Sequence, residues 1–189
     1  MNTYSKPFVL AAVAASLAIL PACSVAEDDA ATDPTATEDQ SQKTVASALG
    51  DMSDMASLNA AISAAELGSI FDGPSSYTVL APNDQAFEAL GESRDGLLDE
   101  AQRPLLAGIL RNHMLPGHLT PEDIGSAIDG QDGDVTMTTL GDGTVTFARD
   151  GDAITVTNAT GSVARLASSA TAATNGVVIP LDAVLVPGE

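Results

Sequence analysis

Hydrophobic residues along this chain recur with two different periods. In the first half they return every three or four positions, as on one face of an α-helix. This spacing predicts helices over 44–49, 54–67, 84–90, from Pro104 onward and over 121–128. From Val135 the period is two, which predicts strands over 135–140, 144–149, 153–157, 162–167, 177–179 and 183–186. Helices followed by strands imply an α+β domain.

Single residues indicate where some of these elements begin and end. Asp54 is expected to cap the helix over 54–67, and Gly68 is expected to end it. Thr120 is expected to cap the helix over 121–128. The helix near Pro104 is expected to bury a stripe formed by Leu105, Leu106, Ile109 and Leu110.

The segment from Tyr77 to Phe87 predicts a strand, a sharp turn and the start of a helix. Tyr77–Leu80 are aromatic, β-branched or aliphatic residues, which favours a strand. Pro82 is expected to stop the strand because it has no N–H group to donate. Asn83 or Asp84 can then cap a helix that buries Phe87.

The N-terminal segment resembles an export signal. Lys6 precedes an apolar run over 8–20, about 13 residues, which suits a signal-peptide core and is too short to span a bilayer. The run ends in Leu20-Pro21-Ala22-Cys23, which resembles a bacterial lipobox, so 1–22 is expected to be removed and Cys23 to be acylated. The alternative is a secreted protein with a free thiol, which the reactivity of an exposed cysteine disfavours.

Residues 26–42 are polar and acidic, with almost no large apolar side chain. Such a segment cannot bury enough surface to offset the entropy of ordering. We therefore expect 23–43 to be a lipidated cysteine followed by a flexible linker, and 44–189 to be one folded domain. Ser24 after the cysteine resembles the pattern for sorting to the outer membrane, which favours the periplasmic face of that membrane or the cell surface.

The chain carries 26 acidic and 7 basic residues, for a formal net charge of -19. Aromatic residues make up only 3% of the sequence, and tryptophan is absent. This charge would repel phosphate backbones, and few aromatic rings are available to stack on bases, so nucleic acid is excluded as a partner. The acidity is interpreted as a source of solubility.

Three sequence blocks, in order, resemble the signature segments of the fasciclin domain. They are 77–87 (YTVLAPNDQAF), 109–117 (ILRNHMLPG) and 173–187 (ATNGVVIPLDAVLVP). The resemblance covers about 44–187, and no internal repeat is visible, so one fasciclin domain is expected. It implies a wedge of helices packed on a β-sandwich-like sheet, and an extracellular adhesion or binding module.

The residues that match the family's motifs are expected to be mainly structural. They are Thr78, Pro82, Asn83, Asp84, Phe87, His113, Pro116, Gly117, Asn175, Gly176 and Asp182. Two positions depart from the pattern through which some animal fasciclin domains recognise integrins. Asn112 stands where the family has Tyr, and 168–172 takes the place of an Asp-Ile pair. Integrin-type recognition is therefore not carried over to this chain.

Two clusters of polar residues suggest metal chemistry at first sight. His113 and His118 are close in sequence, but no further ligand motif assists them, and the favoured interpretation is a buried, hydrogen-bonded His113 and an exposed His118. Residues 129–134 resemble a calcium loop without its closing Glu, and are interpreted as a turn. Because nucleophile-elbow and phosphate-cradling motifs are also absent, the sequence predicts no catalytic site, no metal, no cofactor and no enzyme activity.

Two functions from different classes remain. The favoured one is a membrane-anchored lipoprotein that binds other proteins, surface glycans or matrix. The alternative is a carrier of a hydrophobic small molecule, such as a carotenoid or a lipid. The resemblance supports this alternative because some fasciclin-like proteins bind pigments. The Met-containing, Ala-rich helices could line a groove, although such stripes more often belong to the core.

Overall fold

A computed structural model of the chain describes residues 36–39 and 42–186. Cys23, the expected signal peptide and most of the expected linker lie outside the described residues. Within the described part, no helix is long and apolar enough to cross a membrane.

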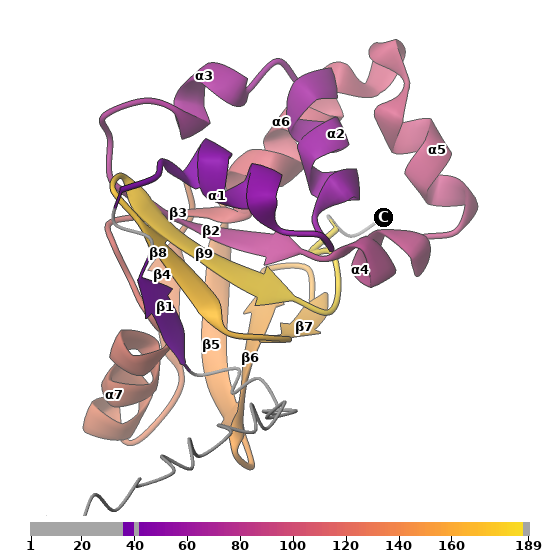
Figure 1. The fold of residues 1–189 in the computed structure, drawn as a ribbon. Coiled ribbons are helices and arrows are strands. Elements are labelled where there is room, and N and C mark those ends of the chain that lie inside the picture. Colours follow the sequence, from indigo (N-terminus) through magenta and orange to yellow (C-terminus); the bar gives the residue numbers. More distant parts are fainter. Residues whose placement is uncertain (1–35, 40–41, 187–189) are drawn as a thin grey trace, which may run out of the picture. The chain divides into compact units, whose positions relative to one another are not determined.

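The described strands form two sheets (Figure 1). The five-stranded sheet has the order β1 (Thr37–Asp39), β8 (Ala170–Ala173), β9 (Gly176–Leu181), β2 (Tyr77–Pro82) and β3 (Met114–Pro116). The four-stranded sheet is an antiparallel meander of β4 (Val135–Thr138), β5 (Thr144–Asp150), β6 (Ala153–Asn158) and β7 (Val163–Arg165). In the first sheet, β2 runs parallel to β9 and antiparallel to β3.

Most of the helices gather on one face of the five-stranded sheet (Figure 1). They are α1 (Val45–Asp51), α2 (Ala56–Ala64), α3 (Gly68–Phe71), α4 (Asp84–Glu88), α5 (Glu92–Leu98), the 3₁₀ turn η1 (Glu100–Gln102) and α6 (Arg103–Asn112). The remaining helix, α7 (Pro121–Gln131), packs on the four-stranded sheet, because Ile124 and Ile128 share a hydrophobic cluster with Phe147 of β5.

Strand β2 is buried at all six of its positions because both faces of its sheet are covered. Its residues alternate between two cores, as the period of two along a strand requires. Tyr77 and Val79 face the helices, whereas Leu80 packs in the cluster that contains Phe147 of the other sheet. The predictions of an α+β fold and of helices packed on a sandwich-like pair of sheets are confirmed.

Local hydrogen bonds fix the starts of two helices where the sequence predicts caps. The Oδ1 atom of Asn83 accepts the N–H of Ala86 at 2.8 Å before α4. Thr120 and Asp123 form a reciprocal capping box before α7, with hydrogen bonds of 3.1 and 3.0 Å. The predicted cap at Thr120 is confirmed, and of the two candidates for α4, Asn83 and Asp84, the cap is Asn83.

The helix predicted over 54–67 is shorter in the structure, where α2 ends at Ala64 and α3, which was not predicted, follows at Gly68. The prediction that Asp54 caps α2 is wrong, because the N-cap position is Met55, whose own side chain makes no cap hydrogen bond. Gly68 begins α3 instead of ending α2, and Glu66 before it has φ +58, which interrupts the helix. The hydrophobic period therefore extended the predicted helix beyond the residue at which the backbone ends α2.

The strands also differ from the prediction in two places. The first sheet continues through Pro82, which pairs with Leu181 of the parallel strand β9. The strand predicted over 183–186 is wrong, since this segment forms none, and the N–H of Leu185 donates to the His113 side chain instead. The short strands β3 and β8 and the helix α5 were not predicted.

Strand β1 lies within 23–43, the segment expected to be a flexible linker. It pairs in parallel with β8, and the N–H of Ala170 donates to the carbonyl oxygen of Ala36 at 2.8 Å. The Thr37 hydroxyl also donates to the carboxylate of Glu122 in α7 at 2.9 Å. Edge pairing uses backbone groups, which every residue type carries, so hydrophobicity gave no sign of it.

Candidate functional site

The three motif blocks meet at the centre of the five-stranded sheet. Strand β2 of the first block lies between β3 of the second block and β9 of the third. In this register Tyr77 pairs with Pro116 on one side and with Gly176 on the other. Segments that are far apart in sequence are therefore direct neighbours in the fold.

Asn175 and Gly176 tie the helices to the sheet. Asn175 is buried, its Oδ1 accepts the N–H of Val45 at 2.8 Å, and its Nδ2 donates to the carbonyl oxygen of Phe71 at 3.0 Å. At Gly176 a Cβ atom would lie 2.1 Å from the carbonyl oxygen of Tyr77, so only glycine fits without a backbone shift.

Asp84 connects two helices, while Phe87 of the same motif is buried in the helical core. Asp84 is the first residue of α4, and its Oδ1 accepts the N–H of Ser57 in the first turn of α2 at 2.7 Å. This hydrogen bond is the largest cause of the lowered pKa of the Asp84 carboxyl group. The backbone N–H of Asp84 also donates to the carbonyl oxygen of Asp54, just before α2, at 2.8 Å. Two hydrogen bonds therefore join the start of α4 to the start of α2.

His113 is a buried connector between α6 and the C-terminal segment. Its Nδ1 lies 2.9 Å from the carbonyl oxygen of Ile109, and its Nε2 accepts the N–H of Leu185 at 3.0 Å. Burial lowers the pKa of His113 to about 4, against the smaller opposing effect of the Ile109 bond. Both ring nitrogens are engaged and His118 is exposed, which confirms the prediction made for the two histidines.

The other motif residues shape turns beside the sheet. The Thr78 hydroxyl donates to the carbonyl oxygen of Gly117 at 3.0 Å and accepts the N–H of Leu119 at 2.8 Å. Gly117 has φ +94, a conformation that favours glycine. Asp182 accepts the N–H of Arg165 at 2.7 Å.

Asn112, where the family has tyrosine, holds the hairpin between β4 and β5. Its Oδ1 accepts the hydroxyl of Thr139 at 2.8 Å. A Cβ atom at Gly141 or Gly143 would lie 2.5 or 2.6 Å from that oxygen. The two glycines thus let the hairpin close over a small polar side chain, and a tyrosine here would require the hairpin to move.

Residues 129–134 form the end of α7 and the turn that follows it. The carboxylate of Asp129 accepts two hydrogen bonds from the guanidinium of Arg149, both at 2.9 Å, and this contact lowers the Asp129 pKa. Asp132 adopts the left-handed conformation, with φ +52, that ends the helix. Among the residues that the structure describes, no group of three His, Cys, Asp or Glu side chains could hold a metal ion.

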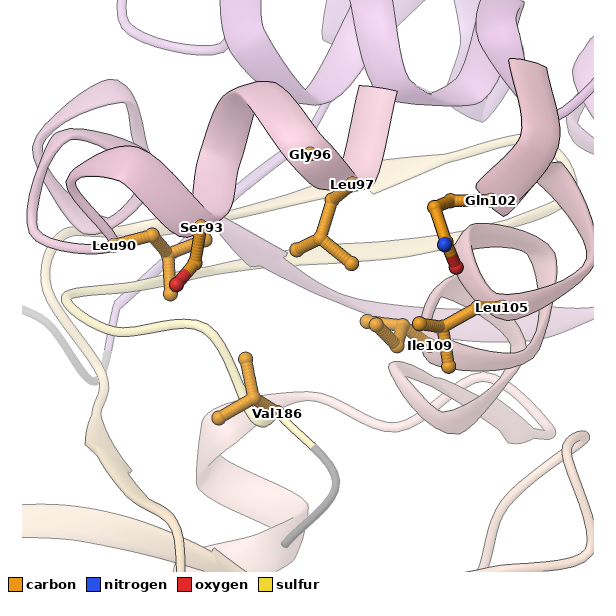
Figure 2. Close-up of a pocket in the computed structure, with 8 residues that line it drawn as sticks. All are labelled: Leu90, Ser93, Gly96, Leu97, Gln102, Leu105, Ile109 and Val186. Atoms are coloured by element: carbon orange, nitrogen blue, oxygen red, sulfur yellow. The ribbon is translucent and has the colours of Figure 1, made fainter. Parts of the chain in front are cut away.

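An apolar groove lies between α5 and α6 (Figure 2). It has a volume of about 440 Å³ and is lined by Leu90, Ser93, Gly96, Leu97, Gln102, Leu105, Ile109 and Val186. Figure 2 shows Leu97, Leu105 and Val186 pointing into the same space. The volume lies within the ~300–1,000 Å³ that is usual for small-molecule sites.

The position of Leu105 corrects the prediction for α6. Leu106, Ile109 and Leu110 are buried as predicted, but Leu105 is 44% exposed at the rim of the groove. The partner wall comes from α5, whose charged residues and Gly96 gave no clear helical stripe. The sequence offered no signal of this groove, because the helical spacing in α6 groups Leu105 with the residues that are buried.

The Met-containing, Ala-rich helices expected to line a groove instead belong to the core. Met55 and Ala61 are both 0% exposed within the helical cluster. None of the residues that line the groove is a methionine. The described part of the chain thus has an apolar groove, but other helices line it.

Comparisons with known proteins agree on one family. A model of the fasciclin domain matches residues 53–187. Transforming growth factor-beta-induced protein ig-h3 of Sus scrofa is 28% identical over 131 residues, which are 69% of this chain and 17% of that protein. This chain therefore spans only a small part of that relative's length.

The fold also matches a solved structure. A FAS1 domain pair from the insect cell adhesion molecule Fasciclin I superimposes with a TM-score of 0.68 at 14% sequence identity. The match covers 78% of this chain and 52% of that one. At this low identity the likeness concerns the fold alone.

Proposed function

This chain belongs to the fasciclin-domain family, and on that ground we propose that it is an extracytoplasmic binding module. We propose in addition that it is anchored to a membrane, on the evidence of its N-terminal sequence. Fasciclin domains are generally adhesion and binding modules of extracellular or secreted proteins. The observation that carries the proposal is the extent of the family match, 53–187, which leaves out only β1 and α1 among the described elements.

A lipid on Cys23 supplies the membrane attachment in this proposal. The apolar run over 8–20 and the lipobox-like residues that follow it support this assignment. Each buried CH₂ group adds ~0.8 kcal/mol, so several acyl chains hold a protein far more firmly than one. Ser24 favours the outer membrane, at its periplasmic face or at the cell surface.

The partners proposed are other proteins, surface glycans or matrix. The motif residues make contacts within the fold, which leaves the rest of the surface for recognition. With a net charge of -19, the chain favours partners that present basic groups, because complementary charge speeds and orients association.

Purification of the full-length protein from its native membranes tests the anchor and the binding role together. We expect mass spectrometry to find acyl chains on Cys23 and to identify partners that copurify. The matched control is Cys23→Ser, which is expected in the soluble fraction. An unmodified Cys23 in the membrane-bound protein would contradict the proposed lipid anchor. Absence of any partner, together with unchanged cell aggregation in a deletion strain, would remove the binding role.

A second candidate function is transport of a hydrophobic small molecule such as a carotenoid or a lipid. The 440 Å³ groove between α5 and α6 supports it, because apolar side chains form most of its lining. An organic extract of the natively purified protein is expected to contain such a compound. A colourless protein whose extract holds no ligand would remove this candidate.

A further inference from the structure

None of the eight described residues that line the groove between α5 and α6 is ionisable. Its polar atoms belong to Ser93, Gln102 and the backbone, which can exchange hydrogen bonds with an uncharged group. Eight lining residues are far fewer than the ~20–30 that each side of a standard protein interface supplies. The groove therefore suits a small molecule better than a protein partner.

The two arginines nearest in sequence to the lining residues donate to groups outside the groove, and the Nε atom of each is buried without a hydrogen-bond partner in the described part of the chain. Arg94 of α5 donates to the hydroxyl of Ser57 in α2 at 3.3 Å. Arg103 of α6 donates to the carboxylate of Glu66 at 2.9 Å. Neither arginine lines the groove, so an anionic head group there would find no cation among the described lining residues.

A charged ligand would also be disfavoured by desolvation and by the field of the whole chain. A carboxylate that leaves water for an apolar groove must be paired, and here it would remain unpaired. The net charge of -19 adds repulsion to this cost. An ammonium group would be attracted to the chain but would likewise find no carboxylate among the described residues that line the groove.

We propose that this groove binds an uncharged, mainly aliphatic molecule with a single hydroxyl or carbonyl group, and that it rejects fatty-acid anions. The polar end of the ligand hydrogen-bonds to Gln102 or Ser93, and its hydrocarbon part packs on Leu97, Leu105 and Ile109. This inference rests on the second candidate function and specifies the class of its ligand.

Two probes of equal chain length test the proposal: 1-decanol, which is neutral, and decanoate, which is anionic at pH 7.5. The protein is the mature chain with Cys23→Ser, so that no acyl chain of its own competes. Binding is followed by NMR shifts of backbone amides. We expect 1-decanol to shift signals of α5 and α6, and decanoate to bind at least tenfold more weakly.

Two variants with the same added charge separate local pairing from net charge. Leu105→Lys places a cation at the rim of the groove and is expected to raise decanoate affinity severalfold. Leu140→Lys is the matched control, because Leu140 is 43% exposed, against 44% for Leu105, and does not line the groove. It is expected to leave the preference for 1-decanol almost unchanged.

The outcomes distinguish this inference from the function beneath it. If decanoate binds the groove as tightly as 1-decanol, the preference for neutral ligands is wrong while a carrier function stands. If neither probe shifts signals of α5 or α6, the groove is not a small-molecule site. The carrier function and the preference for neutral ligands would then both be wrong. An equal gain of decanoate affinity in the two lysine variants would mean that net charge, and not a cation at the rim of the groove, sets this affinity. It would also overturn the inference.

Discussion

His113 joins two segments that are 72 positions apart, and it can do so only in its neutral form. Because Nε2 accepts the N–H of Leu185, the ring proton sits on Nδ1 and is donated to the carbonyl oxygen of Ile109. Protonation of Nε2 would place two donors face to face and release Leu185. The segment released is next to Val186, one wall of the apolar groove.

The first prediction is that stability falls between pH 6.5 and 4. The unfolded chain binds a proton on His113 near pH 6.5, whereas burial lowers the pKa in the folded chain to about 4. The His113 contribution is therefore complete above pH 6.5 and decreases, by ~3 kcal/mol, as the pH falls to 4. Urea unfolding at pH 7, 6, 5 and 4 measures it.

The control for this prediction is His118→Gln, which removes the exposed histidine. Its unfolding free energy must still decrease between pH 6.5 and 4. His113→Phe is expected to be less stable at pH 7 and to lose most of the pH dependence in this range. Stability that is flat from pH 6.5 to 4 would contradict the assignment. The carboxyl groups of Asp84 and Asp123 have lowered pKa values, mainly through backbone hydrogen bonds. Their contributions to stability are therefore lost only below about pH 3.8.

Gly176 yields a second prediction at the scale of one residue. In Gly176→Ala the new methyl would meet the Tyr77 carbonyl oxygen at 2.1 Å, and backbone cannot move aside cheaply. We expect a loss of about 1–3 kcal/mol in unfolding free energy. Gly108→Ala is the matched control, since its methyl would meet nothing within 4 Å inside α6 and should stabilise by about 0.5–1 kcal/mol. Equal effects of the two variants would refute the steric argument.

Among the elements, α2 has its N-terminus capped by a residue from another helix. Asp84 of α4 accepts the N–H of Ser57, whereas Asp54, close to α2 in sequence, supplies no side-chain cap. We therefore expect Asp84→Ala to cost about 1 kcal/mol, and Asp54→Ala to lie within about 0.5 kcal/mol of wild type. Chemical denaturation of both variants at pH 7 decides the matter. If Asp54→Ala lost more unfolding free energy than Asp84→Ala, Asp54 would be the cap of α2, as the sequence predicts.

Elements whose signals are local could be predicted from the sequence. Asn83 and Thr120 cap the helices that follow them, and alternating residues mark β5 and β6. Elements that depend on distant partners could not. Strand β8 is a stretch of Ala and Thr that becomes a strand between β1 and β9, whereas 183–186 has strand-like residues and no neighbouring strand to pair with.

The same distinction applies to the candidate site. The motif residues could be found because each block is contiguous in sequence, although their contacts, such as Asn175 with Val45, span the whole domain. The groove could not be found, since its walls come from α5, α6, Leu90 and Val186. Only the packing of these segments shows that Leu105 lies at a rim and not in the core.

At the scale of the whole molecule, negative charge far exceeds what ion pairs can balance. The described ion pairs are all solvent-exposed and join Lys43 to Asp51, Arg103 to Glu66 and Glu100, Arg149 to Asp129, and Arg165 to Asp150. Exposed pairs contribute little, and salt screens them. The remaining acidic residues repel one another more strongly in the compact state than in the unfolded chain.

Salt should therefore stabilise this protein. Raising NaCl from about 0.01 to 0.1 M shortens the Debye length from ~30 to ~10 Å, which weakens the long-range repulsion of the -19 charge more than it weakens contacts such as Arg149 with Asp129. A gain of about 1 kcal/mol would raise the thermal midpoint by ~2–4 °C in calorimetry. A midpoint that falls with salt would mean that the ion pairs outweigh the repulsion. The argument against anionic ligands in the groove would then lose its long-range component and rest on desolvation alone.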